Sequence, residues 1–174
     1  MLSTSFPDYV TALEAAGFGA WHEDSSAEVR FASLFVVFHI DDDGRKYVLQ
    51  AFDARELARS LDPVGGEFPL GLLQLTFQYP FDVQETSFPD IARWLHRLNN
   101  LLPIGSFLLS EDDQCICHRS TVPAGEAGLP SDVLVEMVGI IRRFCVDLAG
   151  AIEAVATGKM SYQEVLSELT QGDG

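Results

Sequence analysis

The sequence is poor in basic residues. Eleven Lys and Arg stand against 26 Asp and Glu, so the formal net charge of the 174-residue chain is −15. Such a charge repels phosphate backbones and removes the counterion release that drives nonspecific nucleic-acid binding. It also opposes binding to anionic membrane surfaces. We therefore expect neither a nucleic acid nor a membrane as partner, whereas a basic protein surface would be attracted.

Long apolar runs and targeting signals are also missing. No stretch approaches the roughly 20 apolar residues that a membrane-spanning helix needs, and charges interrupt the longest apolar segment at Asp132, Glu136, Arg142, Arg143 and Asp147. The first residues lack the basic and apolar stretches of an export or transit peptide. The chain has three cysteines. An odd number of cysteines without an export signal is typical of reduced thiols rather than of a disulfide framework. These absences favour a cytoplasmic protein.

Apolar residues, by contrast, are plentiful. They make up 47% of the chain and include twelve Phe, which is enough for a packed core. A chain of this length fits one domain. We expect a single domain over residues 1–170 and a flexible tail over residues 171–174.

Local patterns predict the helices. The tetrapeptide Ser-Phe-Pro-Asp occurs at 5–8 and at 87–90, each time before helical apolar spacing, with Ser as the expected N-cap and Pro in the first turn. A long helix is predicted over 131–157. A last short helix begins at a capping box in which Ser161 pairs with Glu164.

β-forming residues between these helices predict strands and turns. The strands are expected over 20–23, 29–40, 45–52, 70–81, 104–109 and 114–121, and a short helical turn and loop over 53–68. Short turns between neighbouring strands favour an antiparallel sheet with helices packed on one face. The predicted class is therefore α+β, with five or six strands in the order α-β-β-β-β-α-β-β-α-α.

The second half of the chain also carries a set of short motifs. They are Leu98-Asn99-Asn100, Gly105-Ser106-Phe107-Leu108-Leu109, the acidic turn Glu111-Asp112-Asp113, and Gly128-Leu129-Pro130-Ser131 before a long helix. Together, over roughly residues 87–155, they resemble the YbjN-like family, which is named for a proposed role in bacterial sensory transduction. That family usually has glycine in the turn after the first hairpin strand, where this chain has Asp113-Gln114.

The resemblance has implications for fold and function. It implies the fold of type III secretion chaperones. It also implies a small, acidic, non-catalytic cytoplasmic protein that binds a protein partner and can form a homodimer.

Cys115, Cys117 and His118 form the most conspicuous group of potential metal ligands. In a strand, Cys115 and Cys117 share one face and His118 lies on the other, so the three cannot converge on one zinc ion. Buried or half-buried cysteines are the favoured interpretation, and a redox-sensitive thiol remains open.

Other reactive residues are scattered. Acidic turns at 41–43 and 111–113 lack the alternating oxygens of a calcium loop, and no glycine pattern suits a phosphate loop. The histidines fall on separate predicted elements: His22, His39, His96 and His118. We predict no catalytic residue, metal ligand or cofactor, and therefore no enzyme.

The helix predicted from residue 88 to 101 carries the candidate contact residues. Trp94 and Leu101 lie beside its apolar stripe, and we predict them as a dimer or partner contact. The alternative is that a neighbouring loop covers Trp94. Asn99 is expected to bond the backbone of the following hairpin if it is buried. The most basic patch of the chain lies on the opposite side, at Arg93, His96 and Arg97.

Apolar surface exceeds what one sheet face needs, because the long helix has a second set of apolar residues beside its core stripe: Val133, Met137, Ile140 and Phe144. We therefore predict a non-enzymatic protein-binding module, chaperone-like or regulatory, whose partner is unknown. The alternative is a small-ligand sensor domain with a pocket between the sheet and the C-terminal helix.

Overall fold

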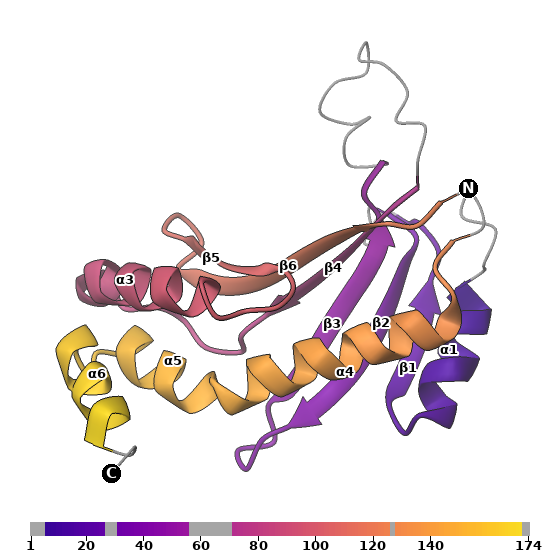
Figure 1. Cartoon of the computed structure of the whole chain (residues 1–174). Coiled ribbons are helices and arrows are strands. Elements are labelled where there is room, and N and C mark those ends of the chain that lie inside the picture. Colours follow the sequence, from indigo (N-terminus) through magenta and orange to yellow (C-terminus); the bar gives the residue numbers. More distant parts are fainter. Residues whose placement is uncertain (1–5, 27–30, 56–70, 126–127, 172–174) are drawn as a thin grey trace.

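The computed structural model describes residues 6–26, 31–55, 71–125 and 128–171 (Figure 1). The elements follow the predicted order: α1 (Phe6–Ala15), β1 (Gly19–Glu23), β2 (Ser33–Ile40), β3 (Lys46–Asp53), β4 (Leu72–Gln78), the 3₁₀ turn η1 (Glu85–Ser87), α3 (Phe88–Asn99), β5 (Ser106–Ser110), β6 (Cys115–Pro123), α4 (Ser131–Asp147), α5 (Ala149–Ala156) and α6 (Tyr162–Gln171). Most of the turn and loop expected over 53–68 and of the tail expected over 171–174 lies outside the described residues.

The strands form one six-stranded sheet in the order β1-β2-β3-β4-β6-β5, and every neighbouring pair is antiparallel. This confirms the predicted α+β class. The hairpin β5–β6 joins the sheet through its second strand, so β6 lies beside β4 and β5 forms an edge. The other edge is β1.

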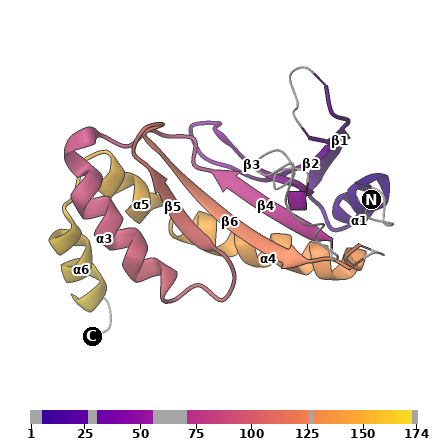
Figure 2. The same ribbon diagram turned by 90° about the horizontal axis from the view of Figure 1, so that it is seen from above.

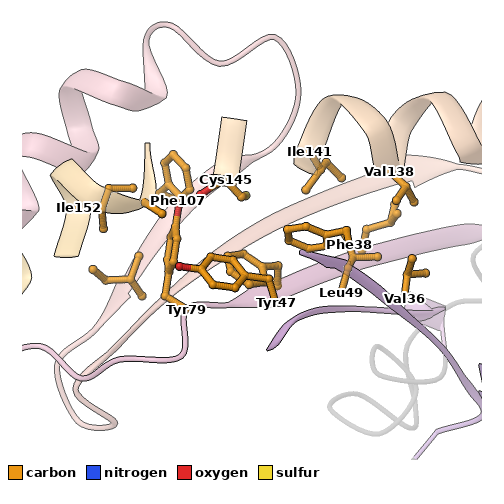
Figure 3. Packing of buried hydrophobic residues seen from close by; sticks show 14 of the residues in the cluster. Val36, Phe38, Tyr47, Leu49, Tyr79, Phe107, Val138, Ile141, Cys145 and Ile152 are labelled. Carbon is orange, nitrogen blue, oxygen red and sulfur yellow. Dashed lines mark hydrogen bonds between the residues drawn. The ribbon is translucent and has the colours of Figure 1, made fainter. Parts of the chain in front are cut away.

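Helix α4 crosses one face of the sheet, with α1 at one end of the molecule and α3, α5 and α6 at the other (Figures 1 and 2). Alternation along the strands explains this arrangement, because buried side chains of successive strands share one face. In Figure 3, Val138 and Ile141 of α4 lie over Val36, Phe38 and Leu49 of the sheet. All five residues are buried.

The start of α3 differs in one detail from the prediction. Pro89 lies in the first turn as expected, but the side chain of Ser87 makes no capping hydrogen bond. The reason is that Ser87 ends the 3₁₀ turn η1 and has helical dihedral angles (φ −93°, ψ −7°), whereas an N-cap residue has an extended backbone. Asp90 instead accepts a hydrogen bond from the backbone N–H of Tyr162 (3.3 Å), which links α3 to the start of α6.

The long C-terminal helix is interrupted. Instead of one helix over 131–157, α4 ends at Asp147 and α5 begins at Ala149. The hydroxyl of the buried Tyr79 donates to the carbonyl of Cys145 at 2.9 Å (Figure 3). Carbonyl groups in the last turn of a helix lack the regular helical partners, so Tyr79 satisfies one of them from the sheet side. This bond ties the end of α4 to the segment after β4.

Candidate interaction surfaces

The side chain of Asn99 forms hydrogen bonds with the backbone of the edge strand β5. Its Oδ1 accepts from the N–H of Phe107 (2.7 Å), and its Nδ2 donates to the carbonyl of the same residue (3.0 Å). The expected bonding of Asn99 to the following hairpin is confirmed. The clamp occupies a backbone pair that an edge strand otherwise leaves open to another chain.

Gly105 lies immediately before this clamped strand. It has a positive φ of +70°, and a Cβ atom on it would lie 2.6 Å from the ring of His118. The His118 ring in turn packs edge-on against Phe107, with 5.5 Å between centroids. Two of the motifs that carry the family resemblance, at 98–100 and 105–109, thus form one packed unit at the sheet edge.

The two predicted contact residues of α3 differ sharply in exposure. Trp94 is 2% exposed, and its Nε1 has no hydrogen-bond partner in the described part of the chain. Leu101, which follows the end of α3, is 69% exposed. Of these two side chains, only that of Leu101 lies exposed on the surface.

A second apolar stripe runs along α4 beside the residues that face the sheet. Val133 is 42% and Ile140 is 37% exposed, and Met137 and Phe144 are half-buried. The spacing of four, three and four residues places these side chains in one row, roughly 100° around the helix from the buried row. We refer to Val133, Met137, Ile140 and Phe144 as the outer stripe of α4.

The face of the sheet away from α4 also carries exposed aromatic surface. Trp21 of β1 stacks on Phe35 of β2 with 5.2 Å between ring centroids, and Trp21 is 39% exposed. Its indole N–H donates to Glu23 at 2.9 Å. Local patterns did not predict this pair, because it depends on the register between β1 and β2.

The cysteines have the arrangement predicted from strand geometry. The sulfur atoms of Cys115 and Cys117 are 3.9 Å apart on one face of β6, and His118 packs on the opposite face against Phe107. Burial, followed by the neighbouring Cys115, raises the pKa of Cys117 to about 12. A thiol with so high a pKa stays protonated near neutral pH and is a poor nucleophile.

His118 is 1% exposed, and its Nε2 lies 3.2 Å from the carbonyl oxygen of Ile104. Its Nδ1 has no hydrogen-bond partner among the described residues. Burial lowers the pKa of His118, and the bond to Ile104 offsets this only in part. Within the described ranges, no three His, Cys, Asp or Glu side chains gather as a metal site.

The acidic turn after β2 has a structural role. Asp41 accepts hydrogen bonds from the backbone N–H and the Nε of Arg45, at 2.8 and 2.7 Å. Arg45 then pairs with both carboxylate oxygens of Glu153 on α5, at 2.8 and 3.0 Å. These bonds hold the pKa of Glu153 below its usual value. The turn therefore fastens the β2–β3 hairpin to α5, a link that spans 108 residues and that local patterns do not reveal.

The space between the sheet and α4, where the sensor hypothesis places a ligand, holds packed aromatic rings. Tyr47 stacks on Phe77 at 5.5 Å between centroids, and Phe38 and Tyr79 pack edge-on against Phe77 at 5.0 and 4.8 Å. Two surface pockets lie elsewhere. One is between α3 and α6, and the other is lined by α5, α6 and Met160 between them.

None of the described helices has the length and apolar character that crossing a membrane requires. Taken together, these features define an acidic α+β domain on an antiparallel sheet, with apolar and basic patches on its helices.

A family model described as "Putative bacterial sensory transduction regulator" (YbjN) matches residues 66–154, which run from the segment before β4 into α5, and the chain belongs to this family. The description is that of a regulator rather than an enzyme. A search of curated proteins finds no match to the chain.

Proposed function

We propose that this chain is a non-enzymatic protein-binding module, regulatory or chaperone-like, that works in the cytoplasm. The observation that carries the proposal is the outer stripe of α4. Val133 and Ile140 of this row stay exposed although the helix already buries another row against its own sheet, and a row of exposed apolar side chains favours a protein contact. The regulatory description of the family agrees with this role.

The spacing of the outer stripe suits a helical partner. Val133, Met137, Ile140 and Phe144 follow the alternating four- and three-residue intervals by which two helices interlock. A second copy of this chain offers the same row, and an antiparallel pair of α4 helices would be self-complementary about a twofold axis. We therefore propose that the first partner to test is a second copy of the chain, bound through α4.

Leu101 is proposed as a second part of the contact surface. Its 69% exposed side chain follows α3, and the buried Trp94 would support this end of the helix from beneath without touching the partner. A relation to the type III secretion chaperone fold, which the family resemblance implies, belongs to the same proposal. It rests on that resemblance alone.

The test compares two isoleucines. Ile140→Glu alters the outer stripe, and Ile40→Glu makes the same change at the end of β2, where Ile40 is 55% exposed. We expect the wild-type protein and Ile40→Glu to dimerise and Ile140→Glu to dissociate at least tenfold more readily, as measured by light scattering coupled to size exclusion. Leu101→Glu tests the second contact in the same way.

A wild-type protein that stays monomeric at high micromolar concentration would contradict the dimer. Binding of another protein would then be tested by pull-down from the native cell. Equal recovery of every partner by the wild type and Ile140→Glu would contradict the wider proposal.

A further inference from the structure

A pocket between α3 and α6 gathers hydrogen-bond donors on a strongly acidic protein. Its volume is about 410 Å³, and six residues line it: Arg93, His96 and Arg97 of α3, Asn100 directly after α3, and Tyr162 and Gln163 of α6. Each of these side chains carries at least one N–H or O–H donor, and no carboxylate is among them. The first four of these residues are spaced by three, one and three positions, which places them on one face of α3 and its C-cap.

The two arginines of this pocket form no ion pair with any described residue. Ion pairs in the described ranges involve Arg45, Arg55 and Arg143, and neither Arg93 nor Arg97 has a carboxylate within 4.0 Å there. Arg93 instead lies over the ring of Tyr162, with its guanidinium carbon 6.0 Å from the centroid. The two charges are one helical turn apart, so they can act on the same ligand.

Asp90 and Glu164, which are close in sequence to the residues of the pocket, already have partners. Asp90 accepts from the N–H of Tyr162 at 3.3 Å, and Glu164 accepts from the N–H and the hydroxyl of Ser161, both at 2.7 Å. Both carboxylates thus serve the start of α6 and form no ion pair with the two arginines of the pocket.

The start of α6 also borders the pocket. Tyr162 and Gln163 are the first two residues of this ten-residue helix. The amino end of a helix carries a partial positive charge that favours anions. At α6 this end already meets the carboxylates of Asp90 and Glu164, so the two arginines of α3 supply the positive charge of the pocket.

We propose that this pocket binds a small phosphate-bearing molecule. Guanidinium groups match phosphate oxygens in pairs, and two arginines with amide and hydroxyl donors suit a charged group with several acceptors. The Tyr162 ring beside Arg93 provides a flat surface for the organic part of the ligand. The volume falls within the range of small-molecule sites, roughly 300–1,000 Å³. The site lies apart from the outer stripe of α4 and does not depend on the proposed protein contact.

Binding is tested on the full chain with two probes, inorganic pyrophosphate and adenosine 5′-monophosphate, by calorimetry at constant ionic strength. We expect saturable binding of at least one probe, with shifts in amide resonances of α3 and α6. Arg93→Gln and Arg97→Gln should each weaken that binding at least tenfold. The matched control is Arg143→Gln, which removes one charge from an arginine on α4 whose side chain is 81% exposed, and it should stay within twofold of the wild type.

Two results would overturn the proposal. One is the absence of saturable binding of either probe at millimolar concentration. The other is an equal loss of binding in Arg143→Gln, which would show a general effect of charge. Unchanged melting temperatures in Arg93→Gln and Arg97→Gln would establish that they remain folded. Because the dimer assay uses the outer stripe of α4, failure here leaves that assay and its conclusion unaffected.

Discussion

Asn99 occupies the place beside Phe107 that a residue of a further β-strand would take. Its side-chain amide both accepts from the N–H and donates to the carbonyl of Phe107. A single side chain thus substitutes for one step of a β-ladder on the outer side of β5. It also fixes the end of α3 against the sheet edge.

Loss of this clamp should lower stability. Asn99→Ala leaves two backbone groups of Phe107 without their partners, and we expect it to reduce the free energy of unfolding by about 2 kcal/mol. Urea denaturation followed by circular dichroism measures the difference. The control is Asn100→Ala, which removes a bond between an exposed side chain and the carbonyl of His96 and should cost less than about 0.5 kcal/mol. Equal costs for the two variants would show that the clamp contributes nothing specific.

Replacement of Gly105 should be more harmful than replacement of another glycine with a similar backbone. Gly105 and Gly44 have φ values of +70° and +77°, but a Cβ atom meets the ring of His118 and the backbone of Arg119 only at Gly105. Gly44→Ala should cost roughly 1–2 kcal/mol, the penalty of the left-handed conformation. Gly105→Ala should cost clearly more, because ring and backbone must also move. Thermal unfolding of both variants tests which of the two loses more stability.

Replacing Gln114 with glycine should make the protein more stable. Gln114 is the one non-glycine residue with a positive φ (+52°) in the described part of the chain. Gln114→Gly should raise the free energy of unfolding by about 1 kcal/mol. Asp112→Gly, at a turn position with negative φ, should instead lower it slightly, because glycine adds disorder to the unfolded chain. A stability loss in Gln114→Gly would contradict this account.

His118 should make stability depend on pH. Burial lowers its pKa below the ordinary value of 6.5, so the unfolded chain binds this proton more readily than the folded one. Its contribution is therefore complete above pH 6.5 and is lost as the pH falls from there toward the lower pKa of the folded state. Chemical denaturation between pH 7.5 and 5 measures how the free energy of unfolding changes with pH. One such proton can contribute up to about 1.4 kcal/mol per pH unit to this slope.

His118→Gln should flatten this slope while keeping an N–H donor for Ile104. The control is His96→Gln, the same change at an exposed histidine of α3. The explanation fails if the two variants show the same dependence on pH.

Local patterns predicted much of the fold. Alternation of apolar side chains gave the strands, helical spacing gave α3 and α4, and the capping box of Ser161 and Glu164 forms as expected. Even the pairing of Asn99 with the next hairpin could be inferred, because a polar side chain beside a buried stripe needs a nearby partner. These features depend on residues close in sequence.

Other features depended on surfaces that meet only in the folded chain. The break between α4 and α5 accompanies a hydroxyl from Tyr79, 66 residues away from Cys145. Likewise, the sequence could not decide whether Trp94 is buried, because a helical stripe shows which side chains are apolar but not which neighbour covers them. The basic patch of α3 was visible, whereas the pocket required α6 to lie beside it.

The sequence by itself therefore determined the elements, their order and the strongly acidic character of this protein, because these follow from local conformational preference and composition. The tertiary structure decided which apolar rows are buried, which remain exposed on α4, and which charges stand unpaired between α3 and α6. Burial and ion pairing are properties of two surfaces in contact, and a linear pattern specifies only one of them at a time.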